Sequence, residues 1–348
     1  MMPKVMHILG SGADGGAEKA CEDITHALHE AGLEQIVVMR EHKKRSEAFK
    51  AAGIKAEVLP FGGLFDFTTP YALKNLVFKY QPDIIQTWLS RAARKLLKFK
   101  RNKPVIVSRL GGYYALKNYK KSDYFIANTP DIKKYLIREG VKEDKIVTIP
   151  NYADPGPQSP GVSKSDFETP QDATVFMTAS RLHKDKGLDV FLKALARIPK
   201  AYGWIVGSGP ERDALKGLAQ KLQISGRVRF LGWRDDIEDI LSCADIFVLA
   251  SRNEPFGNAF LQAWACKKPV IASASQGPGQ FITPGEDGIL FPVDDVDLLA
   301  KAMQEVEQSK KIQDDLAERG FQRFSNEFSK EKCVKAYLDF YNRLYEAR

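Results

Sequence analysis

Residues 174–195 read TVFMTASRLHKDKGLDVFLKAL, and this stretch decides the fold. An apolar run rich in β-branched residues comes first, a loop with several cations and a glycine follows, and apolar residues then recur at helical spacing. The order predicts a buried strand that leads through a short loop into an amphipathic helix. Such a unit belongs to a parallel sheet with helical crossovers.

The same alternation of short apolar runs and helical patterns extends along the whole chain. We predict seven strands in the first half and six in the second, at residues 4–9, 34–40, 56–61, 83–88, 104–109, 124–129, 145–150, 174–180, 202–207, 228–232, 245–251, 269–273 and 288–292. The predicted fold class is therefore α/β, with two Rossmann-like, doubly wound domains facing a central cleft.

The domain boundaries follow from composition. Residues 152–172 carry four prolines and no periodicity, which is typical of a connection between domains. We predict an N-terminal domain over 1–155, a linker over 156–172, a C-terminal domain over 173–325, and a helix over 326–348 that returns to the first domain.

Composition narrows the class of protein. The 348 residues include four scattered cysteines without a CxxC pair, so neither a disulfide framework nor a zinc site is indicated. The start lacks the pattern of a signal peptide, and no apolar run is long enough to span a bilayer. We expect a cytoplasmic protein that is at most peripheral at the inner face of the cytoplasmic membrane.

Charge is unevenly distributed. Residues 1–150 hold 26 Lys and Arg against 16 Asp and Glu, a net charge of +10, whereas the remainder holds 26 against 28. Between Asp83 and Asp123 there are eleven basic residues and no acidic one. This run is either a solvated face or a surface for an anionic partner such as a phosphorylated acceptor, a membrane or nucleic acid.

The segment ILGSGADGGAEKA contains GxGxxG at Gly10, Gly12 and Gly15. One interpretation is the fingerprint of a nicotinamide-dependent dehydrogenase, which would leave the richer signals of the second half unexplained. We favour the other interpretation, in which Gly15 and Gly16 expose backbone N–H groups at a helix start toward an anionic or hydroxyl-rich ligand.

In the second half, four successive strand ends carry glycine or charge. Arg181 and Lys186 follow the first of them, and a planar guanidinium with a mobile ammonium suits a diphosphate. The others carry Gly207, Gly232 and Glu254. Because carboxyl ends of parallel strands share one edge, these residues are expected to surround one ligand.

These motifs, in this order, resemble the retaining glycosyltransferases of the GT-B fold, family 4. The matching segments are GGAEK, IPNYAD, SRLHKDKG, GSGPE, VRFLGW, EPFGNAFLQAWACKKPVIAS and DGILFPVDD, which span nearly the whole chain. The resemblance implies that Arg181 and Lys186 bind the diphosphate of a nucleotide-sugar and that Glu254 accepts hydrogen bonds from sugar hydroxyls. It further implies donor-binding roles for Gly15, Gly16, Gly207, Gly232, Trp233, Phe256, Gly257, Asn258 and Gln262.

The chain departs from the family pattern at Gln262, Arg109 and Tyr152, the last at a position where glycine is common. Gln262 stands where a second glutamate is usual, facing the donor ribose, and an amide keeps hydrogen bonding while losing charge. We expect retuned donor binding rather than an inactive enzyme. Arg109 stands where a histidine is frequent, and offers a cation for an acceptor phosphate or carboxylate. The segment from Ser108 onward is similar to a proteobacterial subgroup that assembles lipopolysaccharide and surface polysaccharides.

The predicted reaction transfers a sugar to a glycan or lipid-linked acceptor with retention of configuration. Glu254, Arg181 and Lys186 are the catalytic candidates, and no cofactor or metal is expected because cations take the role of a divalent ion. The DVD triplet at 295–297 is interpreted as a helix cap. Acceptor-side candidates are Arg109, Arg91 and Arg94. Residues 89–103 are expected to form a helix that either packs on its sheet with an exposed basic face or docks on an anionic membrane.

Two other functions are compatible with parts of the pattern. A nucleotide-sugar epimerase has the same architecture, but it needs an acid/base pair beside the sugar. We find one candidate, Glu254, and no convincing partner for it. A basic nucleic-acid-binding protein would fit the net charge of +8, yet the chain has no recognisable nucleic-acid motif and its second half is net acidic.

Overall fold

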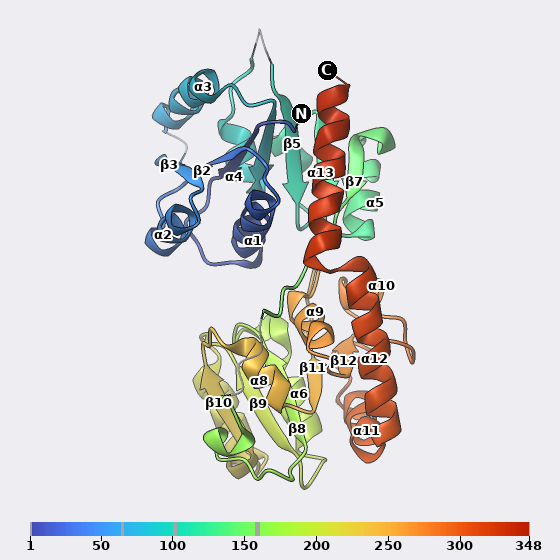
Figure 1. Cartoon of the computed structure of the whole chain (residues 1–348). Coiled ribbons are helices and arrows are strands. Elements are labelled where there is room, and N and C mark those ends of the chain that lie inside the picture. Colours follow the sequence, from blue (N-terminus) through green and yellow to red (C-terminus); the bar gives the residue numbers. More distant parts are fainter. Residues whose placement is uncertain (1, 64–65, 100–102, 157–160, 348) are drawn as a thin grey trace. The chain divides into compact units, whose positions relative to one another are not determined.

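The computed structural model describes residues 2–63, 66–99, 103–156 and 161–347. The chain divides into two compact units, one made of Met1–Asn151 with Lys330–Arg348 and the other of Tyr152–Ser329 (Figure 1). The boundaries thus fall at Asn151 and Lys330, where we predicted residues 155 and 326. Part of the predicted linker, residues 157–160, lies outside the described residues.

The first unit holds one parallel sheet in the order β3-β2-β1-β4-β5-β6-β7. Its strands are β1 (Val5–Leu9), β2 (Gln35–Met39), β3 (Lys55–Val58), β4 (Ile84–Trp88), β5 (Val105–Leu110), β6 (Tyr124–Ala127) and β7 (Ile146–Thr148). Its helices are α1 (Gly16–Glu30), α2 (Lys43–Ala51), α3 (Thr68–Tyr80), α4 (Leu89–Lys95), α5 (Pro130–Arg138) and α13 (Lys330–Glu346), with 3₁₀ turns η1 (Leu116–Tyr119) and η2 (Glu143–Lys145).

The second unit repeats this plan with the order β10-β9-β8-β11-β12-β13, again parallel. Its strands are β8 (Val175–Ala179), β9 (Tyr202–Val206), β10 (Val228–Gly232), β11 (Ile246–Leu249), β12 (Val270–Ser273) and β13 (Ile289–Phe291). Its helices are α6 (Leu188–Leu195), α7 (Arg212–Lys221), α8 (Ile237–Cys243), α9 (Asn258–Ala265), α10 (Pro278–Phe281), α11 (Val296–Gln308) and α12 (Lys310–Glu327), with 3₁₀ turns η3 (Lys164–Phe167), η4 (Lys184–Lys186) and η5 (Ser225–Arg227).

Strands of the second sheet are apolar at consecutive positions because both faces are covered. In β8, Val175 and Met177 join the core on one face while Phe176 joins the core on the other. Alternation of faces along a strand makes this arrangement the expected one for a continuous apolar run. The predicted fold class, two Rossmann-like doubly wound domains, is confirmed by the two sheets.

In both sheets the order in which strands are added across the sheet reverses at one point, between β1 and β4 in the first and between β8 and β11 in the second. In open parallel sheets ligands bind beyond the carboxyl ends of the strands at such switch points. The switch points therefore select the loops after these four strands as the places to look for chemistry.

The described end of the predicted linker is packed on the second unit. Lys164 forms an ion pair with Asp245 at 2.8 Å, the Phe167 and Trp204 rings lie 4.9 Å apart, and the Trp204 indole N–H donates to Thr169 at 3.1 Å. Phe167 and the paired Lys164 anchor this segment to the second unit. Its proline content had suggested a connection separate from both domains.

The predicted helix over 89–103 is wrong in length, since α4 ends at Lys95 and Leu96 has extended backbone. Leu96 is buried at 1% exposure, and Phe99 packs on the same core. Residues 100–102 lie outside the described residues. The apolar side of this segment is interior to the first unit, so it is unavailable to a membrane.

Helix α13 completes the first unit. It packs beside α1, and the Tyr341 hydroxyl donates to the buried Gln86 side chain on β4 at 2.6 Å (Figure 1). Among the described helices, none is long and apolar enough to cross a membrane.

Candidate active site

The loops after β8 and β11 meet at the switch point of the second sheet. The backbone N–H of Arg252 donates to the Asp185 carbonyl at 2.7 Å, which ties the two loops together. Gly187 has φ +59°, and a Cβ there would lie 2.0 Å from the Ala250 carbonyl oxygen. Only glycine permits this approach, so the sequence motif KDKG places its lysine against the second loop for a steric reason.

The central contact is an ion pair between Lys186 and Glu254. Lys186 Nζ lies 2.6 Å from Glu254 Oε2, and the two side chains are only 17% and 15% exposed. The Ser251 hydroxyl donates to the same carboxylate at 3.4 Å, and the Gln276 side chain accepts from the Glu254 backbone N–H at 3.1 Å. A half-buried carboxylate held in place by an ammonium can accept hydrogen bonds from ligand hydroxyls without reorganising.

Arg181 lies at the same edge but is differently placed. Its side chain is exposed, and its guanidinium makes no hydrogen bond with the described residues. The Leu182 backbone that follows is fixed by an N–H donated to the Ser208 carbonyl at 2.9 Å. An anchored backbone with an exposed guanidinium suits an anion that approaches from solvent.

Helix α9 begins directly beyond Glu254. Gly257 is its N-cap with φ +104°, Phe256 is buried at 5% exposure, and Asn258 is the first helical residue. No side-chain hydrogen bond caps this end. The N–H groups of the first turn point along the helix axis toward the same edge, as in any α-helix. One turn in, the Gln262 amide donates to Glu238 Oε1 on α8 at 3.4 Å.

The glycines after β9 and β10 lie side by side. The Gly207 N–H donates to the Gly232 carbonyl at 2.7 Å, and a Cβ on Gly207, which has φ +127°, would lie 1.9 Å from the Ser180 carbonyl. Trp233 follows with 68% exposure, an uncovered aromatic surface at the strand end. The Arg234 guanidinium donates to Asp236 at 2.8 Å and lowers the pKa of that carboxyl, which stabilises the loop.

Several contributors to this edge were missed from sequence. Ser251, Gln276 and Glu238 carry no local motif, and only the folded chain brings them to Glu254 and Gln262. The arrangement as a whole gathers two cations, a carboxylate and the start of helix α9 around one strand edge. It can bind a ligand that has both phosphate and hydroxyl groups.

In the first unit, Gly15 is the N-cap of α1 and Gly16 its first residue, as predicted from the glycine pair. The structure adds Glu18, which is buried at 7% exposure and accepts a hydrogen bond from the Ser11 hydroxyl at 2.5 Å. Its Oε2 would lie 2.7 Å from a Cβ on Gly15. A carboxylate at this helix start disfavours an anion, so a hydroxyl-rich ligand is the better match of our two expectations.

The three arginines expected on the acceptor side have different environments. Arg109 is buried at 3% exposure, where its guanidinium donates to the Tyr337 hydroxyl at 3.0 Å and to the Asn151 side chain. The guanidinium thus hydrogen-bonds inside the first unit, in contrast to our expectation that it is available to an acceptor phosphate or carboxylate. Arg91 is half-buried and within 3.4 Å of the Gly10 carbonyl, while Arg94 is exposed.

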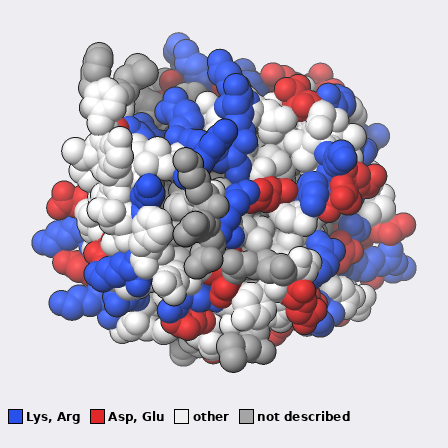
Figure 2. Space-filling model, turned by 90° about the horizontal axis from the view of Figure 1, so that it is seen from above, with Lys and Arg blue, Asp and Glu red and all other residues white. Residues whose placement is uncertain are grey.

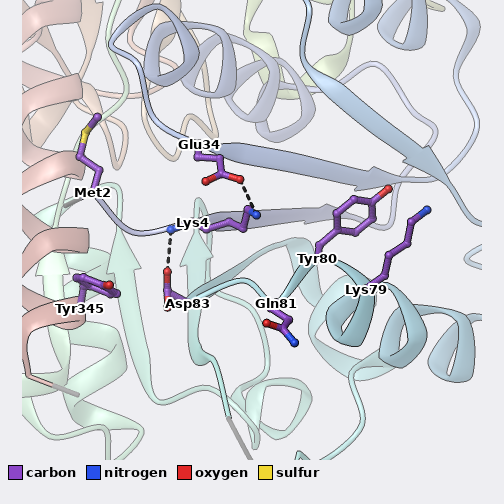
Figure 3. Close-up of a pocket in the computed structure, with 8 residues that line it drawn as sticks. All are labelled: Met2, Lys4, Glu34, Lys79, Tyr80, Gln81, Asp83 and Tyr345. Atoms are coloured by element: carbon purple, nitrogen blue, oxygen red, sulfur yellow. Dashed lines mark hydrogen bonds and ion pairs between the residues drawn. The ribbon is translucent and has the colours of Figure 1, made fainter.

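A depression with a volume of about 410 Å³ lies at the opposite, amino-terminal edge of the first sheet (Figure 3). Lys4 crosses it to Glu34 at 2.5 Å, and the Lys4 backbone N–H donates to Asp83 at 2.9 Å. Its charges pair with one another, and ligands of parallel sheets bind at the other edge. It is therefore not the candidate site.

No group of three or more potential metal ligands occurs among the described residues. The DVD triplet behaves as predicted, since the Asp295 side chain accepts the Leu298 N–H at 2.8 Å and caps α11.

Two doubly wound sheets, with cations and a carboxylate at the carboxyl edge of the second, have the architecture of the GT-B fold, which includes glycosyltransferases. Family models agree with this class: residues 14–156 match the model "Glycosyltransferase Family 4" and residues 162–323 match "Glycosyl transferases group 1".

Relatives make the family certain. The chain is 34% identical to the lipopolysaccharide core biosynthesis glycosyltransferase LpsE of Rhizobium meliloti, over 94% of this chain and 96% of that protein. It is 33% identical to LpsD of the same organism, over 98% of each chain. The protein therefore belongs to the group 1 glycosyltransferases, which favours glycosyl transfer over the epimerase and nucleic-acid-binding alternatives.

Solved structures share the fold. Anabaena HepE, crystallised with UDP and glucose, has a TM-score of 0.83 at 22% identity, over 98% of this chain and 100% of that one. The lipopolysaccharide outer core galactosyltransferase WaaB has a TM-score of 0.73 at 19% identity, over 96% of this chain and 98% of that one.

Proposed function

We propose that the protein transfers a sugar from a nucleotide-sugar to a glycan or lipid-linked acceptor, with retention of configuration and without a metal ion, in lipopolysaccharide or surface-polysaccharide synthesis. The observation that carries this proposal is the Lys186–Glu254 pair at the switch point of the second sheet. The names of LpsE and LpsD support the choice of pathway.

The site suggests how the chemistry proceeds. Cleavage of the bond between sugar and diphosphate develops negative charge on the leaving oxygen, and we infer that Arg181 and Lys186 stabilise it. The positive end of the α9 dipole adds a partial positive charge at the same edge. Glu254 accepts hydrogen bonds from sugar hydroxyls and orients the ring.

The Lys186–Glu254 contact also has a consequence for binding. A lysine paired at 2.6 Å holds the carboxylate in position until the donor arrives. The diphosphate then shares or replaces the carboxylate as the partner of Lys186, which leaves Glu254 available to the sugar.

The acceptor side is assigned to the first unit, with Arg91 and Arg94 as the candidate contacts. At the Gly15–Gly16 helix start, to which a donor-binding role is assigned, Glu18 accepts hydrogen bonds from hydroxyls. Because lipid-linked acceptors reside in a bilayer, we also propose that the protein is peripheral at the inner face of the cytoplasmic membrane.

The test begins with a thermal-shift panel of nucleotide-sugars, followed by transfer assays with the best stabiliser. Retention is checked by the anomeric configuration of the product by NMR. Activity should be unchanged in EDTA, and a loss that manganese restores would overturn the metal-free assignment. Stabilisation by no nucleotide-sugar would count against the proposed donor class.

A further inference from the structure

One side of α3 is unusually apolar for a surface. Phe67, Tyr71 and Phe78 are 69%, 67% and 61% exposed, and their spacing along the helix puts them on one face. The opposite face carries Leu73 and Val77, which are buried in the core of the first unit. The exposed aromatics are therefore surplus to folding.

The same face carries positive charge and no negative charge. Lys74 lies between the aromatic residues, with its Nζ 5.8 Å from the centre of the Phe78 ring, and the sequence of α3 contains no Asp or Glu. Asp66, just before the helix, is engaged by Lys95 at 3.2 Å and caps the Thr69 N–H at 3.0 Å.

Helix α4 packs next to α3 and extends the basic character. Arg94 and, beyond the helix, Lys98 are exposed, within a stretch that has no acidic residue from 84 to 122. Figure 2 shows lysine and arginine side chains gathered in a band on the upper face, next to a largely uncharged area.

We propose that this face of α3, made of Phe67, Tyr71, Lys74 and Phe78, docks on an anionic phospholipid surface. Aromatic side chains partition to the headgroup level of a bilayer, and lysines beside them are attracted to anionic lipids. An aromatic stripe with cations on and beside it matches that surface in both polarity and charge. The inference rests on the proposed use of a lipid-linked acceptor. It assigns the apolar part of the membrane contact to α3 instead of to residues 89–103, which supply only nearby cations.

The first experiment measures co-sedimentation with vesicles of 30% phosphatidylglycerol in phosphatidylcholine and with vesicles of phosphatidylcholine alone. The protein should bind the anionic vesicles, and raised salt should weaken binding because the charge contribution is screened. Tyr71→Ser/Phe78→Ser should reduce the partition coefficient about tenfold or more, since it removes most of the exposed aromatic area.

The matched control is Leu298→Ser, which removes an exposed apolar side chain, 44% exposed, from α11 of the second unit and should leave partitioning unchanged. Both variants should keep the wild-type thermal midpoint, because the altered side chains are exposed. In a second measurement, Phe78→Trp with brominated phosphatidylglycerol should show tryptophan quenching beyond that of the wild type.

Failure of the wild type to bind anionic vesicles, or undiminished binding by the double variant, would overturn the inference. Such a result leaves donor binding and transfer to a detergent-solubilised acceptor unaffected, so it is distinct from a failure of the proposed function. Binding that persists in phosphatidylcholine alone would also refute it, because charge would then have no part.

Discussion

Replacing Gln262 by glutamate restores the residue usual in this family, yet the structure predicts weaker donor binding. The Gln262 amide donates to Glu238 at 3.4 Å, so a carboxylate at 262 would face another carboxylate at about the same distance. Two unit charges about 4 Å apart repel by about 1 kcal/mol in water and about 4 kcal/mol near a protein surface. Both side chains are half-buried and can rotate apart, so we expect a net cost of about 1 to 2 kcal/mol.

This cost should appear as donor affinity about tenfold lower at pH 8, measured by calorimetry with the nucleotide-sugar that stabilises the protein most. The extra charge opposes an anionic diphosphate, and repulsion turns the side chain away from the ligand edge. The deficit should shrink toward pH 5, because the paired carboxylates share a proton at low pH. The exchange variant Glu238→Gln/Gln262→Glu recreates one amide and one carboxylate, and should return affinity to within about threefold of wild type.

The chain offers a matched control. Gln322 donates to Glu318 at 3.1 Å on exposed α12, so Gln322→Glu creates the same kind of carboxylate contact away from the site and should leave donor affinity unchanged. Tighter binding by Gln262→Glu, equal at pH 8 and pH 5, would refute the reasoning, since Glu238 would then not constrain position 262.

Three further changes test separate features. Lys186→Met should lower kcat/KM at least about a hundredfold in a transfer assay, because it removes a cation from the leaving diphosphate. The control Lys310→Met on α12 should leave kcat/KM unchanged. Equal kcat/KM for Lys186→Met and the wild type would contradict the role assigned to Lys186. Burial lowers the pKa of His7 from 6.5 to about 4, so the unfolded chain binds a proton more readily and stability falls as pH drops. Urea unfolding at pH 7 and pH 5 should show a loss of about 2 kcal/mol that His7→Gln abolishes. An unchanged pH dependence in that variant would be inconsistent with a buried neutral imidazole. Arg109→Met should destabilise the first unit by about 2 to 4 kcal/mol, because the partners of a buried guanidinium lose their donor. Calorimetry should show the second unit unaffected. A loss of activity at full stability would instead return Arg109 to the acceptor site.

Sequence predicted the elements better than their packing. All predicted strands are present because buried parallel strands leave a strong local signal of apolar, β-branched runs between glycines and charges. The segment after Leu89 misled us because helical periodicity cannot reveal that Leu96 inserts into a core as extended chain.

The candidate site was predictable where a motif carries its own geometry. The glycine of KDKG and the helix start at Gly257 fix positions through local backbone, so Lys186 and Glu254 could be named from sequence. Glu238 and the burial of Arg109 depend on contacts between residues distant in the chain. One sequence without aligned relatives holds no signal for such contacts.

The place of α13 in the first unit has a consequence for biosynthesis. The slots for Tyr337 and Tyr341, beside Arg109 and Gln86, can be filled only after every residue of the second unit has been translated. During translation the contiguous segment 152–329 can fold first. The first unit is synthesised earlier, but its Arg109 and Gln86 side chains lack their α13 partners until the end of the chain is made. A chain that ends before residue 330 would thus lack the partners that α13 supplies to Arg109 and Gln86.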